Sequence, residues 1–202
     1  MKSPVDVVNI ALARLSESPI VSLDENTDRA NKIRPIWAIS LHLFLTESEW
    51  SFARVRTSPA RLNIPAGAAR PFRYAYALPE DCIKVVAVFG SATWWTRRHY
   101  RPDYRVALYD GGNRQSITTS ADGVEVEYIS NRVNISNFPP DAIDAVACRV
   151  AAEFALSLDG SSQRGNQLMQ FYDTAVAKAK KNDVKKEPPG CLDDEYSRVR
   201  LP

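Results

Sequence analysis

Two glutamates in a stretch with an extended pattern are the residues best spaced for acid–base chemistry. Glu125 and Glu127 alternate with valines between residues 124 and 132, so both carboxylates would lie on one face of a strand. Paired carboxylates hydrolyse glycosides when their separation suits a general acid and a nucleophile or base, and Asp110 adds a third acid in a glycine-rich turn. A solvent-facing strand edge explains the same pattern more simply. A carbohydrate-active, glycosidase-like protein therefore stands as one alternative, which replacement of both glutamates would test.

Metal and cofactor chemistry finds little support in the available side chains. The sequence has two histidines, His42 and His99, and three widely separated cysteines, Cys82, Cys148 and Cys191, without the spacings of zinc or iron sites. It also lacks the glycine-rich phosphate-binding motifs of nucleotide enzymes. Because His42 is flanked by apolar residues on a helical pattern, we predict a structural histidine there. We further predict free thiols in a reducing compartment, no metal, no cofactor and no enzymatic activity.

An aromatic and basic run from residue 94 to residue 101 is the strongest candidate for a binding surface. It contains Trp94, Trp95, Arg97, Arg98, Tyr100 and Arg101, residue types that dominate the hot spots of protein interfaces. Since consecutive strand residues point to opposite faces, one tryptophan can lie in the core while the other contacts a partner; burial in the core alone is the competing interpretation. The same side chains could stack on single-stranded nucleic acid. A nucleic-acid-binding module is therefore a second alternative, and its affinity should fall steeply with added salt.

The composition is that of an ordinary globular protein. The 202 residues are 45% apolar and 25% charged with a formal charge of +2, which allows a core for one domain or two small ones and does not require an anionic partner. Asp6 and Asn9 interrupt the apolar N-terminal stretch, so we predict no signal peptide. No apolar run approaches the length of a membrane span. We expect a protein made in a cytoplasm and without membrane contact.

Apolar spacing predicts four helices. The first begins after Ser3-Pro4, with Asp6 completing a capping box, and should stop near Ser16. The second starts at Thr27 or Asp28, and we expect one element bent at Pro35. The third and fourth cover residues 141–158 and 162–182.

Between these helix pairs, short apolar runs and turn signals predict strands in an antiparallel meander. The expected strands are Ser51–Thr57, Arg73–Ala77, Ile83–Phe89, Trp94–His99, Arg105–Tyr109, Arg114–Thr118 and Val124–Arg132.

The predicted fold class is therefore α+β. Two N-terminal and two C-terminal helices would form a helical part resembling a four-helix bundle, with an inserted antiparallel β region. We place the N-terminal helices in residues 1–49, the β domain in 50–137, the C-terminal helices in 138–183 and an extended tail in 184–202. Trp50 and Phe52 mark the helix-to-strand junction, where two large aromatic side chains could clamp a helical layer onto a β layer.

Six landmarks recur in an order known from one family. They are Asn9–Leu15 followed by Pro19–Leu23, Ala30–Leu45 leading into Trp50–Ala53, Tyr74–Cys82, Val126–Ile129, Phe138–Pro140 before the alanine-rich helix, and the basic ending Tyr196–Arg200. In this order the chain resembles tail tubular protein A, the head-to-tail adaptor or gatekeeper of short-tailed, podovirus-type bacteriophages. Two local departures are Ser16-Glu17 in place of the usual glycine after the first helix, and Ser48-Glu49 where a His-Pro pair is common.

The resemblance implies a structural virion protein without catalysis. Family members form a dodecameric ring between the portal protein and the tail nozzle, tail tubular protein B, and line the channel for genomic DNA during ejection, without sequence-specific binding. Tail fibres are a further candidate partner. The location would be the head-to-tail interface of the virion, after assembly in the host cytoplasm. The helical part would form the ring wall and the β part the contacts that face the tail.

The polar C-terminal segment is a candidate anchor. With few apolar residues, it is expected to become ordered on a neighbouring copy or on the portal. Tyr196, Arg198 and Arg200 would make the contacts. Normal assembly onto the portal after truncation at Asn182 would contradict this role.

Overall fold

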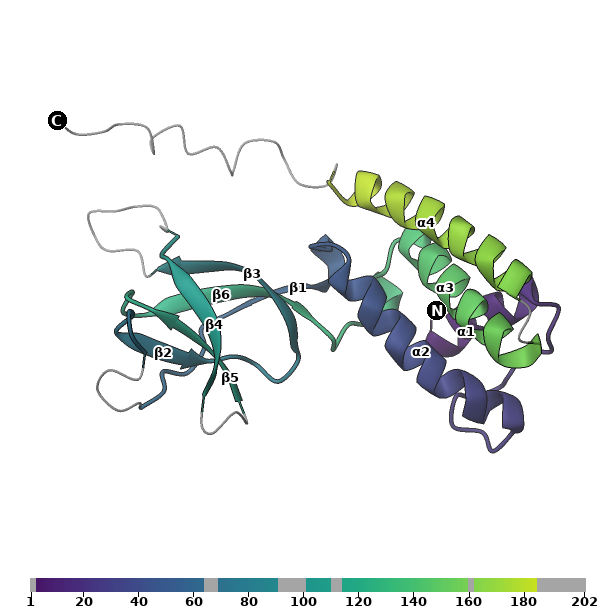
Figure 1. The fold of residues 1–202 in the computed structure, drawn as a ribbon, viewed down its shortest axis with the longest axis horizontal. Helices are drawn as coiled ribbons and strands as arrows, with labels where there is room; N and C mark the ends of the chain where they lie inside the picture. Colours follow the sequence, from purple (N-terminus) through teal and green to yellow (C-terminus); the bar gives the residue numbers. More distant parts are fainter. Residues whose placement is uncertain (1–2, 64–68, 91–100, 110–113, 160–161, 185–202) are drawn as a thin grey trace. The chain divides into compact units, whose positions relative to one another are not determined.

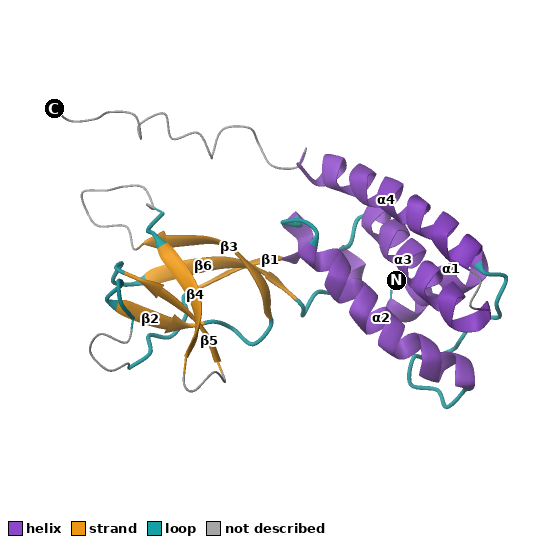
Figure 2. Ribbon diagram, in the orientation of Figure 1, coloured by secondary structure: helices purple, strands orange, loops and turns teal. Residues whose placement is uncertain are grey.

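The computed structural model describes residues 3–63, 69–90, 101–109, 114–159 and 162–184, and the chain divides into two compact units. The first, called here the helical unit, comprises Met1–Trp37 and Phe138–Pro202; the second, the β unit, comprises Ala38–Asn137. The described residues form four α-helices and two three-stranded antiparallel sheets (Figures 1 and 2). The predicted α+β class is confirmed, while the domain limits predicted from the sequence stay predictions.

Helix α1 (Pro4–Arg14) begins as its capping signals predict. The Asp6 backbone N–H donates to Ser3 Oγ over 3.2 Å, and the Ser3 N–H donates to the Asp6 carboxylate over 2.8 Å. After the helix, Ser16 has a φ of 61°, a left-handed conformation that glycine adopts without cost. Ser16 thus adopts a conformation that glycine usually adopts at the end of a helix.

Helix α2 (Asp28–Thr46) is one continuous element that contains Pro35. Its start is capped by Thr27, whose Oγ1 accepts the Ala30 N–H over 3.3 Å. Ala30, Ile33 and the more distal Phe44 are fully buried at the predicted spacing.

The structural role predicted for His42 is wrong, because this side chain is exposed. His42 shares its helix face with residues three and four positions away. Of these, Ala38, Ile39 and Thr46 are exposed, and Leu45 is buried. The apolar residues beside it in the sequence point elsewhere.

Helices α3 (Pro140–Asp159) and α4 (Ser162–Val184) pack against each other in the helical unit (Figure 2). Small side chains on α3 allow close approach, and six alanines are buried: Ala142, Ala145, Ala147, Ala151, Ala152 and Ala155. The backbones come nearest at Gly165, where a Cβ atom would lie 3.1 Å from Leu156 Cδ2 and 3.5 Å from the Ala152 carbonyl oxygen. The predicted helix pair is therefore present as a tight hairpin.

The β unit contains two sheets with strand orders β1-β6-β3 and β2-β5-β4. The strands are β1 (Arg54–Thr57), β2 (Tyr74–Ala77), β3 (Cys82–Gly90), β4 (Tyr104–Tyr109), β5 (Arg114–Thr119) and β6 (Val124–Ser130). All described pairs are antiparallel, but the predicted meander is wrong. Only β4 and β5 pair as sequence neighbours, since the other pairings join strands that are distant in the sequence. The predicted strand Trp94–His99 lies outside the described residues.

The outer edge of β2 is covered by a short segment of the same chain, residues 60–62, called here the strap. The Leu62 N–H donates to the Ala75 carbonyl over 2.8 Å, and the Ala77 N–H donates to the Ala60 carbonyl over 2.9 Å. Arg61 also forms an isolated bridge with Tyr76. The strap therefore satisfies backbone groups that an edge strand otherwise exposes.

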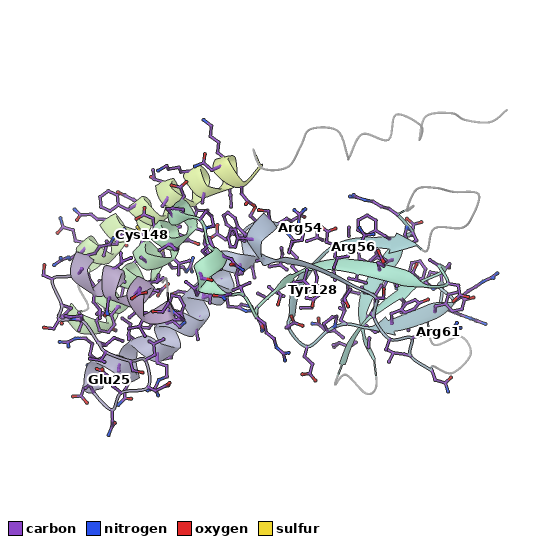
Figure 3. All side chains as sticks on the ribbon, turned by 180° about the vertical axis from the view of Figure 1, so that it is seen from behind. Glu25, Arg54, Arg56, Arg61, Tyr128 and Cys148 are labelled. Atoms are coloured by element: carbon purple, nitrogen blue, oxygen red, sulfur yellow. The ribbon has the colours of Figure 1, made fainter. Side chains whose placement is uncertain are left out.

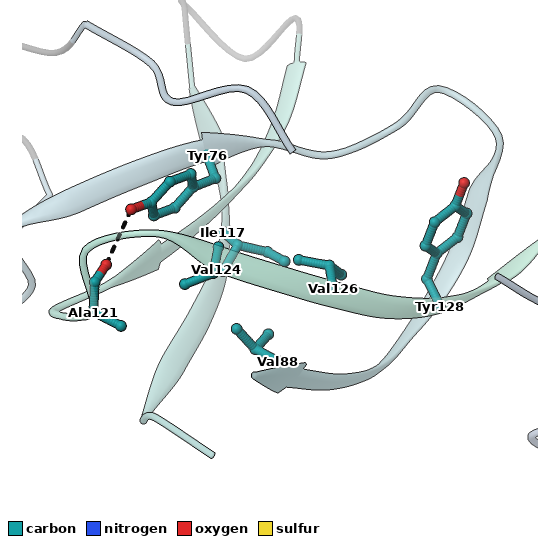
Figure 4. Packing of buried hydrophobic residues seen from close by; sticks show 7 residues of the cluster. All are labelled: Tyr76, Val88, Ile117, Ala121, Val124, Val126 and Tyr128. Atoms are coloured by element: carbon teal, nitrogen blue, oxygen red, sulfur yellow. Dashed lines mark hydrogen bonds between the residues drawn. The ribbon is translucent and has the colours of Figure 1, made fainter. Parts of the chain in front are cut away.

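Inward side chains of both sheets form the core of the β unit (Figure 4). Val88 and Val126 come from one sheet, and Tyr76 and Ile117 come from the other. The Tyr76 hydroxyl donates to the Ala121 carbonyl over 3.0 Å and accepts the Gly123 N–H over 2.8 Å. This buried tyrosine fixes the turn before β6.

Candidate functional site

The helix-to-strand junction is a local aromatic clamp inside the β unit. Trp50 is fully buried, and its ring stacks on Phe44 with centroids 4.6 Å apart and an interplanar angle of 19°. Its Nε1–H donates to the Phe44 carbonyl over 2.8 Å, and the Phe52 ring lies 5.5 Å away. Trp50 therefore closes the last turn of α2 and fixes the start of β1.

Both glutamates proposed for acid–base chemistry are in ion pairs. On one face of the β1–β6 pair, Glu127 contacts Arg54 at 3.2 Å and Glu125 contacts Arg56 at 2.5 Å (Figure 3). Asp110, the third candidate acid, lies outside the described residues. Both candidate glutamates therefore have an arginine as their ion-pair partner.

Two arginine side chains lie over the ring of Phe89 on β3. The sequence did not predict these contacts. The Arg56 guanidinium lies 4.3 Å from the centre of the Phe89 ring, and that of Arg101 lies 5.5 Å from it. Arg101 is the last residue of the predicted aromatic and basic run, and the part of this run that the structure describes. It lies over an aromatic ring, a combination typical of binding sites.

A partly buried polar network ties the turn before β3 to the end of β6. Ser130 Oγ donates to Asp81 Oδ2 over 2.5 Å, and the Tyr128 hydroxyl lies 3.3 Å from both Asp81 oxygens. Burial opposes the charged form of Asp81, but these hydrogen bonds outweigh it and hold the pKa of its carboxyl below the ordinary value. Burial, then the nearby Asp81 charge, raises the pKa of Tyr128 to about 12, and burial raises that of Cys82 to about 11. These hydrogen bonds hold the two segments together.

In the helical unit, Arg14 links three helices. Its guanidinium pairs with the Asp144 carboxylate on α3 and donates to Cys148 Sγ over 2.7 Å. Its carbonyl accepts a hydrogen bond from Arg164 on α4 over 2.9 Å. Burial raises the pKa of the Cys148 thiol, and both described cysteines are free.

A cavity of about 380 Å³ lies beside the strap and the start of β2. Arg61, Asn63, Arg73 and Tyr74 contribute to its lining, and the Arg61 guanidinium stacks 4.2 Å from the centre of the Tyr74 ring. Arg61 also contacts Asp122 at 3.3 Å. The cavity is basic and suits an anionic group by charge.

Each unit exposes large apolar side chains. On β4, Tyr104, Val106 and Leu108 are 37%, 44% and 67% exposed, and they are called here the β4 row. In the helical unit, Leu156 on α3 and Phe171 on α4 are 46% and 63% exposed. Sequence reasoning identified these residues as strand or helix members without recognising their exposure. Such residues mark contacts with other proteins when they gather on a surface.

The remaining predicted interface residues cannot be placed. Trp94, Trp95, Arg97, Arg98 and Tyr100 lie outside the described residues. The same holds for the tail residues Tyr196, Arg198 and Arg200.

The described ranges contain neither a candidate metal-binding cluster nor a candidate membrane-spanning helix. These ranges contain no group of three or more His, Cys, Asp or Glu side chains that could hold a metal ion. Within the same ranges, no helix has both the length and the apolarity that crossing a bilayer requires.

Comparison with known proteins gives matches among solved structures alone. No protein-family model matches the sequence, and no curated protein matches it. A chain from the virion of a native gene transfer agent (GTA) particle is 14% identical over 86% of this chain and 91% of that chain, with a TM-score of 0.32. A chain from the neck of an empty GTA particle, computed with C6 symmetry, is 12% identical over 82% and 87%, also with a TM-score of 0.32. At this TM-score the matches assign the chain to no structural class.

Proposed function

We propose that this protein is a structural component of a phage virion, a ring-forming head-to-tail adaptor that acts without catalysis. Copies of the chain would close into a ring, a dodecamer by analogy with the tail tubular protein A family, between the portal protein and the tail nozzle. The ring would line the channel through which genomic DNA passes, without sequence-specific binding. Tail fibres would be additional neighbours of the tail-facing side.

The observation that carries this proposal is that both units expose apolar side chains of their own. A ring requires heterologous contacts, in which two different surfaces of neighbouring copies meet. Phe171 in the helical unit and Leu108 in the β unit are each more than half exposed, at 63% and 67%. The chain thus offers two dissimilar adhesive surfaces.

The sequence supports the same assignment through the order of its landmarks, which extend over nearly the whole chain. The described landmarks fall on elements that hold the fold together. Trp50 forms the aromatic clamp, and Asp81 with Tyr128 forms the polar network between β3 and β6. The predicted interface residues Trp94, Trp95 and Tyr196 would contact partners at the tail nozzle or portal.

Electron microscopy and mass photometry of the purified chain, alone and mixed with the portal protein of the same phage, test this function. We expect rings, or rings that appear when portal is added. A chain that stays monomeric and does not bind portal at any concentration tested would refute the proposal.

Matched variants locate the contacts. Phe171→Asp and Leu108→Asp should each reduce ring formation at least about tenfold, since each places a charge in an interface that must lose water. Val21→Asp is the control, because Val21 is an isolated apolar residue with 91% exposure. Circular dichroism should show an unchanged fold for all three variants. Equal assembly by all three would show that neither surface takes part.

A further inference from the structure

The edge of β4 that faces away from β5 is the candidate binding edge of the β unit. β4 pairs with β5 on one side, and no described strand pairs with it on the other. The opposite edge of this sheet, at β2, is covered by the strap. Backbone groups along an open edge are ready to pair with an additional extended segment.

The β4 row continues the core of the β unit. Val106 lies opposite Ile117 in the β4–β5 register, and Ile117 is fully buried in the core. Residues directly opposite each other in an antiparallel pair lie on the same face of the sheet, so Val106 and its neighbours Tyr104 and Leu108 extend the inner face. They are nevertheless 37% to 67% exposed. An occupant of this edge should therefore bring apolar side chains at alternate positions.

The C-terminal segment has this pattern. Val199 and Leu201 are two residues apart, so they lie on one face of an extended chain, while the two neighbouring arginines lie on the other. Residues 185–202 follow the last described residue of α4. In extended form they can reach about 60 Å, at about 3.3 Å per residue.

Charge also favours this occupant. The tail carries three consecutive acids, Asp193, Asp194 and Glu195, shortly before its apolar pair. At the beginning of β4, Arg101 and Arg105 are both exposed. A tail running parallel to β4, with Val199 beside Val106 and Leu201 beside Leu108, can thus place its acids near Arg101.

We propose that the C-terminal segment of one copy adds as a strand to the open edge of β4 in a neighbouring copy, with Val199 and Leu201 covering the β4 row. This inference rests on the proposed function in assigning the two partners to copies of one ring. It makes the tail an arm between copies and assigns the β4 row to contacts within the ring.

Crosslinking between two full-length variants tests the arm. One chain carries Leu108→Cys and the other Val199→Cys, both with Cys191→Ser, and a short bis-maleimide joins thiols that lie close together. We expect a crosslinked dimer from the mixture and at least about fivefold less from a control mixture in which Val21→Cys replaces Leu108→Cys. An excess of a synthetic peptide of residues 185–202 should compete with the tail and reduce the dimer yield. Val106→Asp in the Leu108→Cys chain should also reduce it at least about fivefold, because the charge would have to enter the covered row.

The outcomes separate this inference from the proposed function. Equal yields from the test and control mixtures would overturn the arm. The Leu108→Cys thiol could also stay unreactive toward the maleimide whether or not the peptide is added. That result would point to another occupant of the β4 edge, such as residues 91–100 or a different protein, and would also overturn the arm. If rings still form on the portal in these cases, the adaptor function stands. If no rings form and portal is not bound, the adaptor function fails whatever the crosslinking shows.

Discussion

Replacement of Trp50 gives the sharpest test of how the β unit is held to the end of α2. Trp50→Ala removes a fully buried ring that stacks on Phe44 and donates to its carbonyl. Trp50→Phe keeps an aromatic ring and removes only the indole donor and part of the volume. The pair of variants separates packing from hydrogen bonding.

The expected magnitudes follow from burial. A tryptophan buries about 200 Å², and at about 25 cal/mol per Å² this corresponds to about 5 kcal/mol as an upper estimate. Truncation of large buried aromatics costs about 3 to 5 kcal/mol, so we expect about 4 kcal/mol for Trp50→Ala. The Phe44 carbonyl also accepts the Glu47 N–H over 3.2 Å. It therefore keeps one partner in Trp50→Phe, and we expect a cost of about 1 to 2 kcal/mol.

Urea unfolding followed by circular dichroism measures both costs. With a slope of about 2 kcal/mol per molar urea, Trp50→Ala should lower the midpoint by about 2 M and Trp50→Phe by less than about 1 M. Phe171→Ala is the control, because that ring is 63% exposed and exposed sites change stability by about 0.5 kcal/mol or less. A cost below about 1.5 kcal/mol for Trp50→Ala, or equal costs for the two Trp50 variants, would refute the clamp.

Three further predictions concern single contacts. Ser16→Gly should stabilise the chain by about 0.5 to 1 kcal/mol in thermal unfolding, because glycine tolerates the φ of 61°; a lower Tm would contradict this explanation. The pKa of Asp81 is lowered in the folded state, so its stabilising effect is present above its ordinary pKa of 3.8 and is lost as the pH falls through the folded value. Asp81→Asn should thus destabilise at pH 7 and flatten the loss of stability on acidification, whereas an unchanged acid profile would exclude the network. A double-mutant cycle of Arg56→Ala and Glu125→Ala should give a coupling of about 0.5 kcal/mol that weakens with salt, since both side chains are about 40% exposed; a coupling above about 2 kcal/mol would contradict a screened surface pair.

Helix positions could be predicted from the sequence because their signals are local. Ser3 and Asp6 specify the start of α1 within four residues, and the capping hydrogen bonds are present. Apolar spacing likewise predicted that α2 continues through Pro35. His42 was misplaced because its apolar neighbours are adjacent in the sequence, whereas a helix face is shared by residues three and four apart.

Strand pairing could not be predicted in the same way. The turn signals near residues 110–113 predict the β4–β5 pair, which forms. The pairs of β6 with β1 and β3 join strands far apart in the sequence, and no local signal specifies them. The sequence therefore identified most strands but not the order of the two sheets.

The binding surface predicted for the aromatic and basic run stays a prediction, because residues 94–100 lie outside the described residues. Its last residue, Arg101, lies over the Phe89 ring. The β4 row was missed because alternating apolar residues predict a buried strand face just as well as an exposed one. Only the position of β4 at the end of its sheet leaves this face uncovered.

The strap along β2 has a consequence for unwanted polymerisation. A sheet with two free edges can add chains at both and grow without limit, as in fibrils. Because residues 60–62 occupy the β2 edge, this sheet can gain a strand only at β4. A copy that accepts a strand there presents no second open edge on the same sheet among the described strands, so the sheet does not extend at both edges.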